Sequence, residues 1–93
     1  MQNKMNPVHP GEILKEELQE RGLSATALAR ALEVPPNRIT SIVNEQRSVT
    51  PETAILLSRF FNSSPEFWLN LQQTWELRQA ENRFEQEQRV ASR

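Results

Sequence analysis

Residues 24–44 have the sequence SATALARALEVPPNRITSIVN, and this stretch decides the fold. It predicts two short amphipathic helices, at residues 24–32 and 36–44, with a tight turn between them. Helices of this length are marginal alone in water, so both must pack on each other and on further helices. The apolar residues that recur at helical spacing are Leu28, Leu32, Ile39, Ile42 and Val43.

Ala29 is a small residue at the position where close crossing of the two helices requires one. Two short helices joined by a tight turn form a helix-turn-helix unit. The usual purpose of that unit is to hold its second helix in the major groove of DNA. The stretch therefore predicts a DNA-binding domain.

The rest of the chain is predicted to be helical as well. It has only two glycines and no alternating β-branched run. A helix is expected from Pro10 to Arg21, where Gly22 supplies a left-handed stop. Two further helices are expected to begin at the similar sequences Thr50-Pro51-Glu52 and Ser64-Pro65-Glu66. In each, the hydroxyl residue is the N-cap, the proline takes the first helical position, and the glutamate interacts with the positive end of the helix dipole. The fold class is thus all-α with five helices.

We expect the helix at 51–61 to be the most buried and the aromatic residues to form core. These aromatic residues are Phe60, Phe61, Phe67, Trp68 and Trp75. At 100° per residue, one face of the last helix carries Phe67, Trp68, Leu71 and Trp75. The nearly opposite face carries Leu69, Leu77, Ala80 and Phe84.

The second apolar face of the last helix predicts a homodimer, because a long charged helix without a partner would fray. Scattered apolar surface residues are the alternative explanation. The expected organisation is a flexible segment at 1–8, a helix-turn-helix domain at 9–88 that includes a dimerisation helix at 65–88, and a frayed tail at 89–93.

Composition limits the function classes. The 93 residues carry a net charge of -1 and no cysteine, and no apolar run is long enough to span a membrane. Residues 1–8 lack a signal-peptide core, so we expect a cytoplasmic protein. The one histidine, His9, has no ligand cluster or nucleophile beside it, so it is assigned to the entry of the first helix. No enzyme activity, metal, cofactor or small-molecule substrate is predicted.

Charge is distributed unevenly along the chain. Between Arg21 and Arg47 there are four arginines and two glutamates, a local balance of +2 in an otherwise acidic chain. This balance predicts a small DNA-neutralising face with few phosphate contacts, multiplied by dimerisation.

The buried residues of the helix at 36–44 point its polar residues outward. Asn37, Ser41 and Asn44 lie at the centre of that face, and Arg38 and Thr40 lie at its edges. Amide, hydroxyl and guanidinium groups are suited to base edges in the major groove. The residues expected to reach phosphates are Arg47, Arg30 and the N–H groups that open the preceding helix at Ser24 to Thr26.

Three segments carry a family resemblance: HPGEIL at 9–14, NRITSIVN at 37–44 and PEFWLNLQ at 65–72. With them, the chain resembles the HigA/VapI-type antitoxins of the Xre/lambda-repressor-like helix-turn-helix class. The resemblance implies a five-helix repressor-like domain that dimerises through its C-terminal region and binds a palindromic operator at its own promoter. It also implies a HigB-like toxin partner, an mRNA endonuclease that the antitoxin neutralises.

By the same resemblance, bases would be contacted by Asn37, Thr40, Ser41 and Asn44, and bases or phosphates by Arg38 and Arg47. Three residues depart from the family pattern. Ala25 replaces a glutamine, while Glu33 and Glu45 replace glycines. A non-glycine residue costs on the order of 1 kcal/mol if the backbone at Glu33 is left-handed.

Two further functions remain open from the sequence. A solitary or phage-derived Xre-type regulator would share every residue argument and lack the toxin. A protein-interaction module without DNA binding is suggested by the negative charges of Glu33 and Glu45.

Overall fold

The computed structural model describes residues 7–91, with side chains described as far as residue 87. The five predicted helices are confirmed as α1 (Pro10–Glu20), α2 (Ala25–Leu32), α3 (Pro36–Val43), α4 (Pro51–Phe61) and α5 (Pro65–Ala91). No strand occurs within residues 7–91. In that part of the chain, no helix combines the length and apolar character that crossing a membrane needs.

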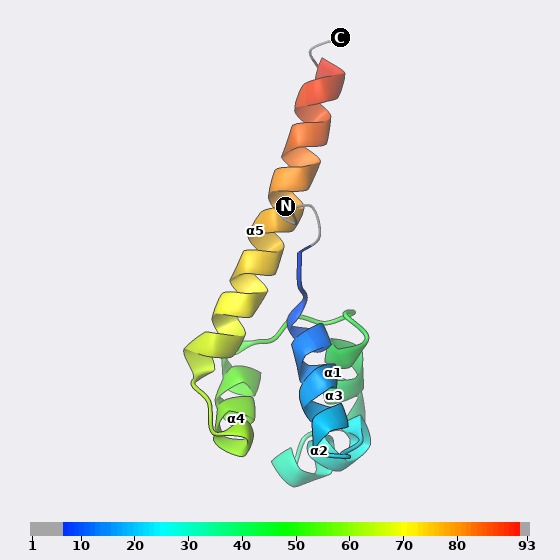
Figure 1. The fold of residues 1–93 in the computed structure, drawn as a ribbon, viewed down its shortest axis with the longest axis vertical. Helices are drawn as coiled ribbons and strands as arrows, with labels where there is room; N and C mark the ends of the chain where they lie inside the picture. Colours follow the sequence, from blue (N-terminus) through cyan, green and yellow to red (C-terminus); the bar gives the residue numbers. More distant parts are fainter. Residues whose placement is uncertain (1–6, 92–93) are drawn as a thin grey trace.

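Four short helices form a compact group from which the long α5 projects (Figure 1). Helix α2 packs on α3, α4 packs on the first half of α5, and α1 bridges α3 and α5. The molecule measures 53 × 26 × 21 Å, and its radius of gyration of 15.4 Å exceeds the value of about 12 Å typical of a compact domain of this length. The second half of α5 therefore extends beyond the core.

Local hydrogen bonds fix the starts of the helices, as the sequence predicts. The hydroxyl of Ser24 accepts from Ala27 N at 3.0 Å. The hydroxyl of Thr50 accepts from Thr53 N at 3.3 Å, and Ser64 repeats the pattern at the start of α5. Each bond satisfies a backbone donor that an α-helix leaves free in its first turn.

The core lies where α1 to α4 meet the first half of α5. It is formed by one contiguous cluster of apolar side chains. Trp68 of α5 is its largest member, and the indole N–H donates to the Ser63 hydroxyl at 3.1 Å, so the buried ring leaves no donor unsatisfied. The cluster consists of Leu14, Leu18, Leu28, Ala29, Ile39, Ile42, Val49, Ala54, Leu57, Phe61 and Trp68.

The prediction that all the aromatic residues are core is wrong for two of them. Phe60 and Phe67 are 39% and 44% exposed, whereas Phe61 and Trp68 are buried. Leu69, predicted on the outer face of α5, instead packs against the core. The buried arc of α5 is centred near Trp68 and Gln72, so Phe67 and Leu69 lie at its two edges.

Helix α5 is longer than predicted. Its 27 residues run to Ala91, past the expected ends near 87 and 88. The helix is about 40 Å long at 1.5 Å per residue. The remainder of the predicted tail, 92–93, and most of the predicted flexible segment, 1–6, lie outside the described residues.

Candidate nucleic-acid interface

The buried side of α3 fixes the side that it exposes. Ile39 and Ile42 are fully buried in the core cluster, and α3 packs on α2. The opposite side of α3 therefore faces away from the core, as expected for the second helix of a helix-turn-helix unit.

The polar residues predicted for α3 lie on this outward side. Asn37 and Asn44 are exposed, and Arg38, Thr40 and Ser41 are half-buried. Among residues 7–87, no hydrogen bond or ion pair engages any of these five side chains. Their donors and acceptors are thus available to a ligand.

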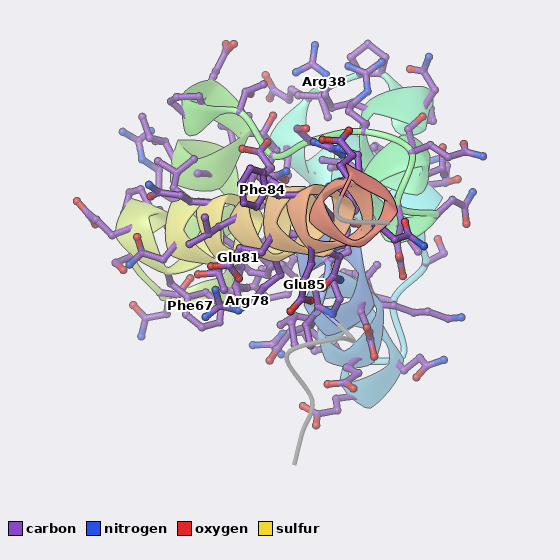
Figure 2. All side chains as sticks on the ribbon, turned by 90° about the horizontal axis from the view of Figure 1, so that it is seen from above. Arg38, Phe67, Arg78, Glu81, Phe84 and Glu85 are labelled. Carbon is purple, nitrogen blue, oxygen red and sulfur yellow. The ribbon has the colours of Figure 1, made fainter. Side chains whose placement is uncertain are left out.

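A shallow groove of about 380 Å³ adjoins α3. It is lined by two arginines that are nine residues apart in the sequence, Arg38 and Arg47, and by the N-terminus of α4. Figure 2 shows Arg38 at the periphery of the domain. Two guanidinium groups and the positive end of a helix favour an anion, and the carboxylate of Glu52 is the one opposing charge. The groove is lined by Arg38, Arg47, Ser48, Thr50, Pro51, Glu52 and Thr53.

The residues of α2 that were expected to contact phosphates lie apart from this groove. The Ser24 hydroxyl is occupied as the cap of α2. Thr26 is exposed in the first turn, and Arg30 is exposed in the last turn. They do not line the groove that Arg38 and Arg47 share.

Sequence reasoning missed Gln72 of α5. This side chain is buried, and its amide contacts the loop between α3 and α4. A polar residue within the apolar arc of α5 was the available signal. Nothing in the sequence indicated that its partner would be Val49, which lies 23 residues earlier.

The backbone at Glu33 and Glu45 is left-handed, with φ 61° at both positions. At Glu45 the conformation closes α3, because Glu45 N donates to Ile42 O and Gln46 N donates to Ser41 O. Glycine adopts this conformation without cost, whereas a glutamate there costs about 1–2 kcal/mol. The strain anticipated at Glu33 is therefore present, and Glu45 adds a second instance beside Asn44.

His9 serves the entry of α1, as predicted. It is buried, and its Nδ1 accepts from Gly11 N at 2.9 Å. Its ring meets the Trp75 ring edge-on, with 4.7 Å between centroids. Burial lowers the pKa of His9, while the nearby carboxylate of Glu45 raises it. Within residues 7–87, no group of three potential metal-ligating side chains comes together.

The predicted dimerisation residues of α5 occupy unequal environments. Leu77 and Phe84 are 51% and 62% exposed, and Ala80 is half-buried. Leu69 belongs to the edge of the chain's own core. In Figure 2, Phe84 points to a different side of α5 from Arg78 and Glu85.

Comparison with known sequences relates the chain to DNA-binding regulators. The helix-turn-helix family model matches residues 14–68. Virulence-associated protein I of Dichelobacter nodosus is 52% identical over 80 residues, which cover 85% of this chain and 74% of that protein. Antitoxin HigA-1 of Vibrio cholerae is 38% identical over 85 residues, which cover 90% of this chain and 80% of that protein.

A solved structure extends the similarity to the whole fold. The Pseudomonas aeruginosa antitoxin HigA with the higBA promoter superposes with a TM-score of 0.84 at 43% sequence identity. The match covers 88% of this chain and 90% of that one. The arrangement of α1 to α5 is therefore shared with an antitoxin whose structure was determined with DNA.

Proposed function

Because this chain belongs to the Xre-like helix-turn-helix family that includes the HigA antitoxins, we propose that it is an antitoxin that binds operator DNA and represses its own operon. One observation carries the proposal. The outward side of α3 presents five unengaged polar side chains next to a groove that Arg38 and Arg47 line. This combination offers base-reading groups and phosphate-binding groups on one continuous surface.

In this proposal, the position of each residue on α3 or in the adjacent groove determines whether it contacts a base or a phosphate. Asn37, Thr40, Ser41 and Asn44 contact base edges, where an Asn amide can pair with adenine through two hydrogen bonds. Arg47 binds a phosphate from the groove, and Arg38 contacts a phosphate or a base. The exposed start of α2, at Ser24 and Thr26, adds backbone contacts to the neighbouring strand.

Operator binding is tested by titrating the full chain against its own promoter fragment at several salt concentrations. Asn37→Ala should cost about 1–3 kcal/mol on the operator and little on unrelated DNA. Arg47→Ala should weaken binding to both DNAs and lower the salt slope by about one. Arg59→Ala is the matched control, because Arg59 is exposed at the opposite end of α4 from the groove. Absence of operator-specific binding at low salt would overturn the proposal.

We further propose that the protein acts as a homodimer through the outer face of α5. Support comes from the exposure of Leu77 and Phe84 on the part of α5 that projects beyond the core. Phe84 lies on an open surface of α5 beside Ala80, Glu81, Arg83 and Glu87. Dimerisation would double the few phosphate contacts that one copy of a chain with net charge -1 can make.

The proposed protein partner is a HigB-like toxin, an mRNA endonuclease that the chain neutralises. Similarity to antitoxin HigA-1 supports this assignment. The test is whether a short, basic protein encoded by the adjacent gene copurifies with the chain and loses its toxicity when both are expressed. A neighbouring gene of another kind would favour a solitary regulator instead.

A protein-interaction module without DNA binding is the competing function. The observation in its favour is Glu45, a negative charge beside Asn44 at the end of α3. If it is correct, Asn37→Ala and Arg38→Ala leave every activity of the protein intact. In either case we propose a cytoplasmic, non-enzymatic protein that needs no cofactor.

A further inference from the structure

Gln72 joins α5 to the loop that enters α4. Its Oε1 accepts from Val49 N at 2.9 Å, which fixes the orientation of the amide because a backbone N–H can only donate. Its Nε2 donates to the Ser48 hydroxyl at 3.3 Å and to Glu76 Oε2 at 3.0 Å. The side chain is 6% exposed; its bond to Val49 is buried, whereas its bonds to Ser48 and Glu76 are partly buried.

The loop held by Gln72 leads directly to the groove beside α3. Arg47 precedes the two bonded residues, Ser48 and Val49, and Thr50 follows them as the cap of α4. Arg47, Ser48 and Thr50 all line the groove. The position of the groove relative to α3 therefore depends on a bond made from α5.

Apolar packing alone leaves this loop incompletely fixed. Val49 anchors it with a side chain that is 3% exposed, but the Val49 N–H lies outside any helix and takes Gln72 as its partner. A buried N–H without a partner is costly, so loss of the amide forces the loop to open toward water. Opening at Val49 moves Arg47 and Thr50 with it.

We propose that Gln72 is a positioning residue for DNA binding: by holding Ser48 and Val49, it sets Arg47 and the start of α4 in register with α3 so that they bind one backbone phosphate. The inference rests on the proposed operator binding. Gln72 itself is buried and does not contact the DNA; it acts through Arg47.

The test is a binding titration of Gln72→Met, which keeps the length and apolar volume of the side chain and removes its hydrogen bonds. We expect operator affinity to fall by about three- to ten-fold and the salt slope to decrease by about one, as if a phosphate contact were lost. Glu76→Gln is the matched control, because it leaves the bonds from Gln72 to the loop in place and should bind as the wild type does.

Double variants separate positioning from a general loss of structure. In the Gln72→Met background, Arg47→Ala should add little further loss, because the contact is already gone. Asn37→Ala should keep its full effect there, because α3 is intact. An unchanged salt slope together with a full effect of Arg47→Ala would overturn the inference.

Two further outcomes are interpreted separately: failure of the variant to fold, and failure of the wild-type chain to bind its operator. If Gln72→Met does not fold, as judged by its helical circular dichroism, Gln72→Asn decides, since its amide is one methylene shorter and loses the bond to Val49 N while keeping a polar group. A wild-type salt slope for a folded Gln72→Asn would then overturn the inference. If the wild-type chain itself does not bind its operator, the proposed function fails, and the inference fails with it.

Discussion

Gly11 of α1 lies directly against the carbonyl oxygen of Ile42 in α3, so closely that a Cβ on Gly11 would overlap that oxygen. Helices α1 and α3 thus touch through backbone at this point, with no side chain between them. The absence of a side chain at residue 11 is therefore a condition for the observed crossing of α1 and α3.

Gly11→Ala should lower the free energy of unfolding by about 1–3 kcal/mol, because the backbone of α3 must move to make room. Helix propensity alone predicts the opposite sign, since alanine is favoured over glycine inside a helix by about 1 kcal/mol. Urea denaturation measures the difference. Gly22→Ala is the comparison: nothing lies within 4 Å of a Cβ there, and only the φ of 61° opposes it. A Gly11→Ala variant more stable than the wild type would contradict the crossing.

Glu33→Gly should raise the free energy of unfolding by about 0.5–1 kcal/mol. Removing the left-handed penalty gains about 1–2 kcal/mol, and part of it is offset by the greater freedom of glycine in the unfolded chain. Glu33 follows α2 and is exposed, so no packing is lost. Thermal unfolding measures the change, and a lower melting temperature would refute the assignment of strain.

Substitutions at Glu45 separate strain from charge. Glu45→Gly removes both, whereas Glu45→Gln removes the charge and keeps the left-handed side-chain penalty. Both should tighten operator binding, because a negative charge beside Asn44 opposes phosphate. Only Glu45→Gly should also increase stability. Equal stability of the two variants would contradict the strain, and unchanged DNA affinity in both would place Glu45 away from the DNA.

Stability should fall as the solution is acidified below neutral pH, in part because of His9. Burial lowers its pKa below the ordinary 6.5, with Glu45 opposing the shift, so the fold favours the neutral ring that caps α1. The unfolded chain then binds more protons than the folded one. The contribution of His9 is therefore fully present above pH 6.5 and is lost as the pH falls through the folded-state pKa.

His9→Asn isolates this effect. Asparagine is a good N-cap acceptor and does not titrate, so the variant should lose less stability than the wild type between pH 7 and pH 5. The lost contact with Trp75 shifts the whole curve without changing its slope. Urea denaturation at a series of pH values gives both curves, and parallel curves would show that His9 does not contribute.

Phe84→Asp should convert the proposed dimer into monomers of 10.8 kDa in sedimentation velocity. A carboxylate in the centre of the outer face of α5 would have to be buried without a partner. Phe67→Asp is the matched control, since Phe67 is also an exposed phenylalanine of α5 but lies in its first turn, where an acidic residue is tolerated. An unchanged mass for Phe84→Asp would remove this face as the interface.

Much of the fold is specified by the sequence alone because its signals are local. Ser24, Thr50 and Ser64 cap their helices through bonds that span three residues, and a proline follows the cap in α4 and α5. The polar side of α3 follows from Ile39 and Ile42 within the same two turns. Such features depend on backbone geometry within a few residues, which the order of residues fixes directly.

The tertiary structure decided which side chains from these elements lie close together. Arg38 and Arg47 line one groove only because the loop that follows α3 places the start of α4 beside them, and Gln72 reaches Val49 across 23 residues of sequence. Helical periodicity alone could not show that Leu69, rather than Phe67, packs against the core. The centre of the buried arc is set by how α5 lies on α4. The sequence determined the helices and their polar faces, whereas packing between distant segments determined the surface they form, since burial depends on neighbours that local periodicity does not specify.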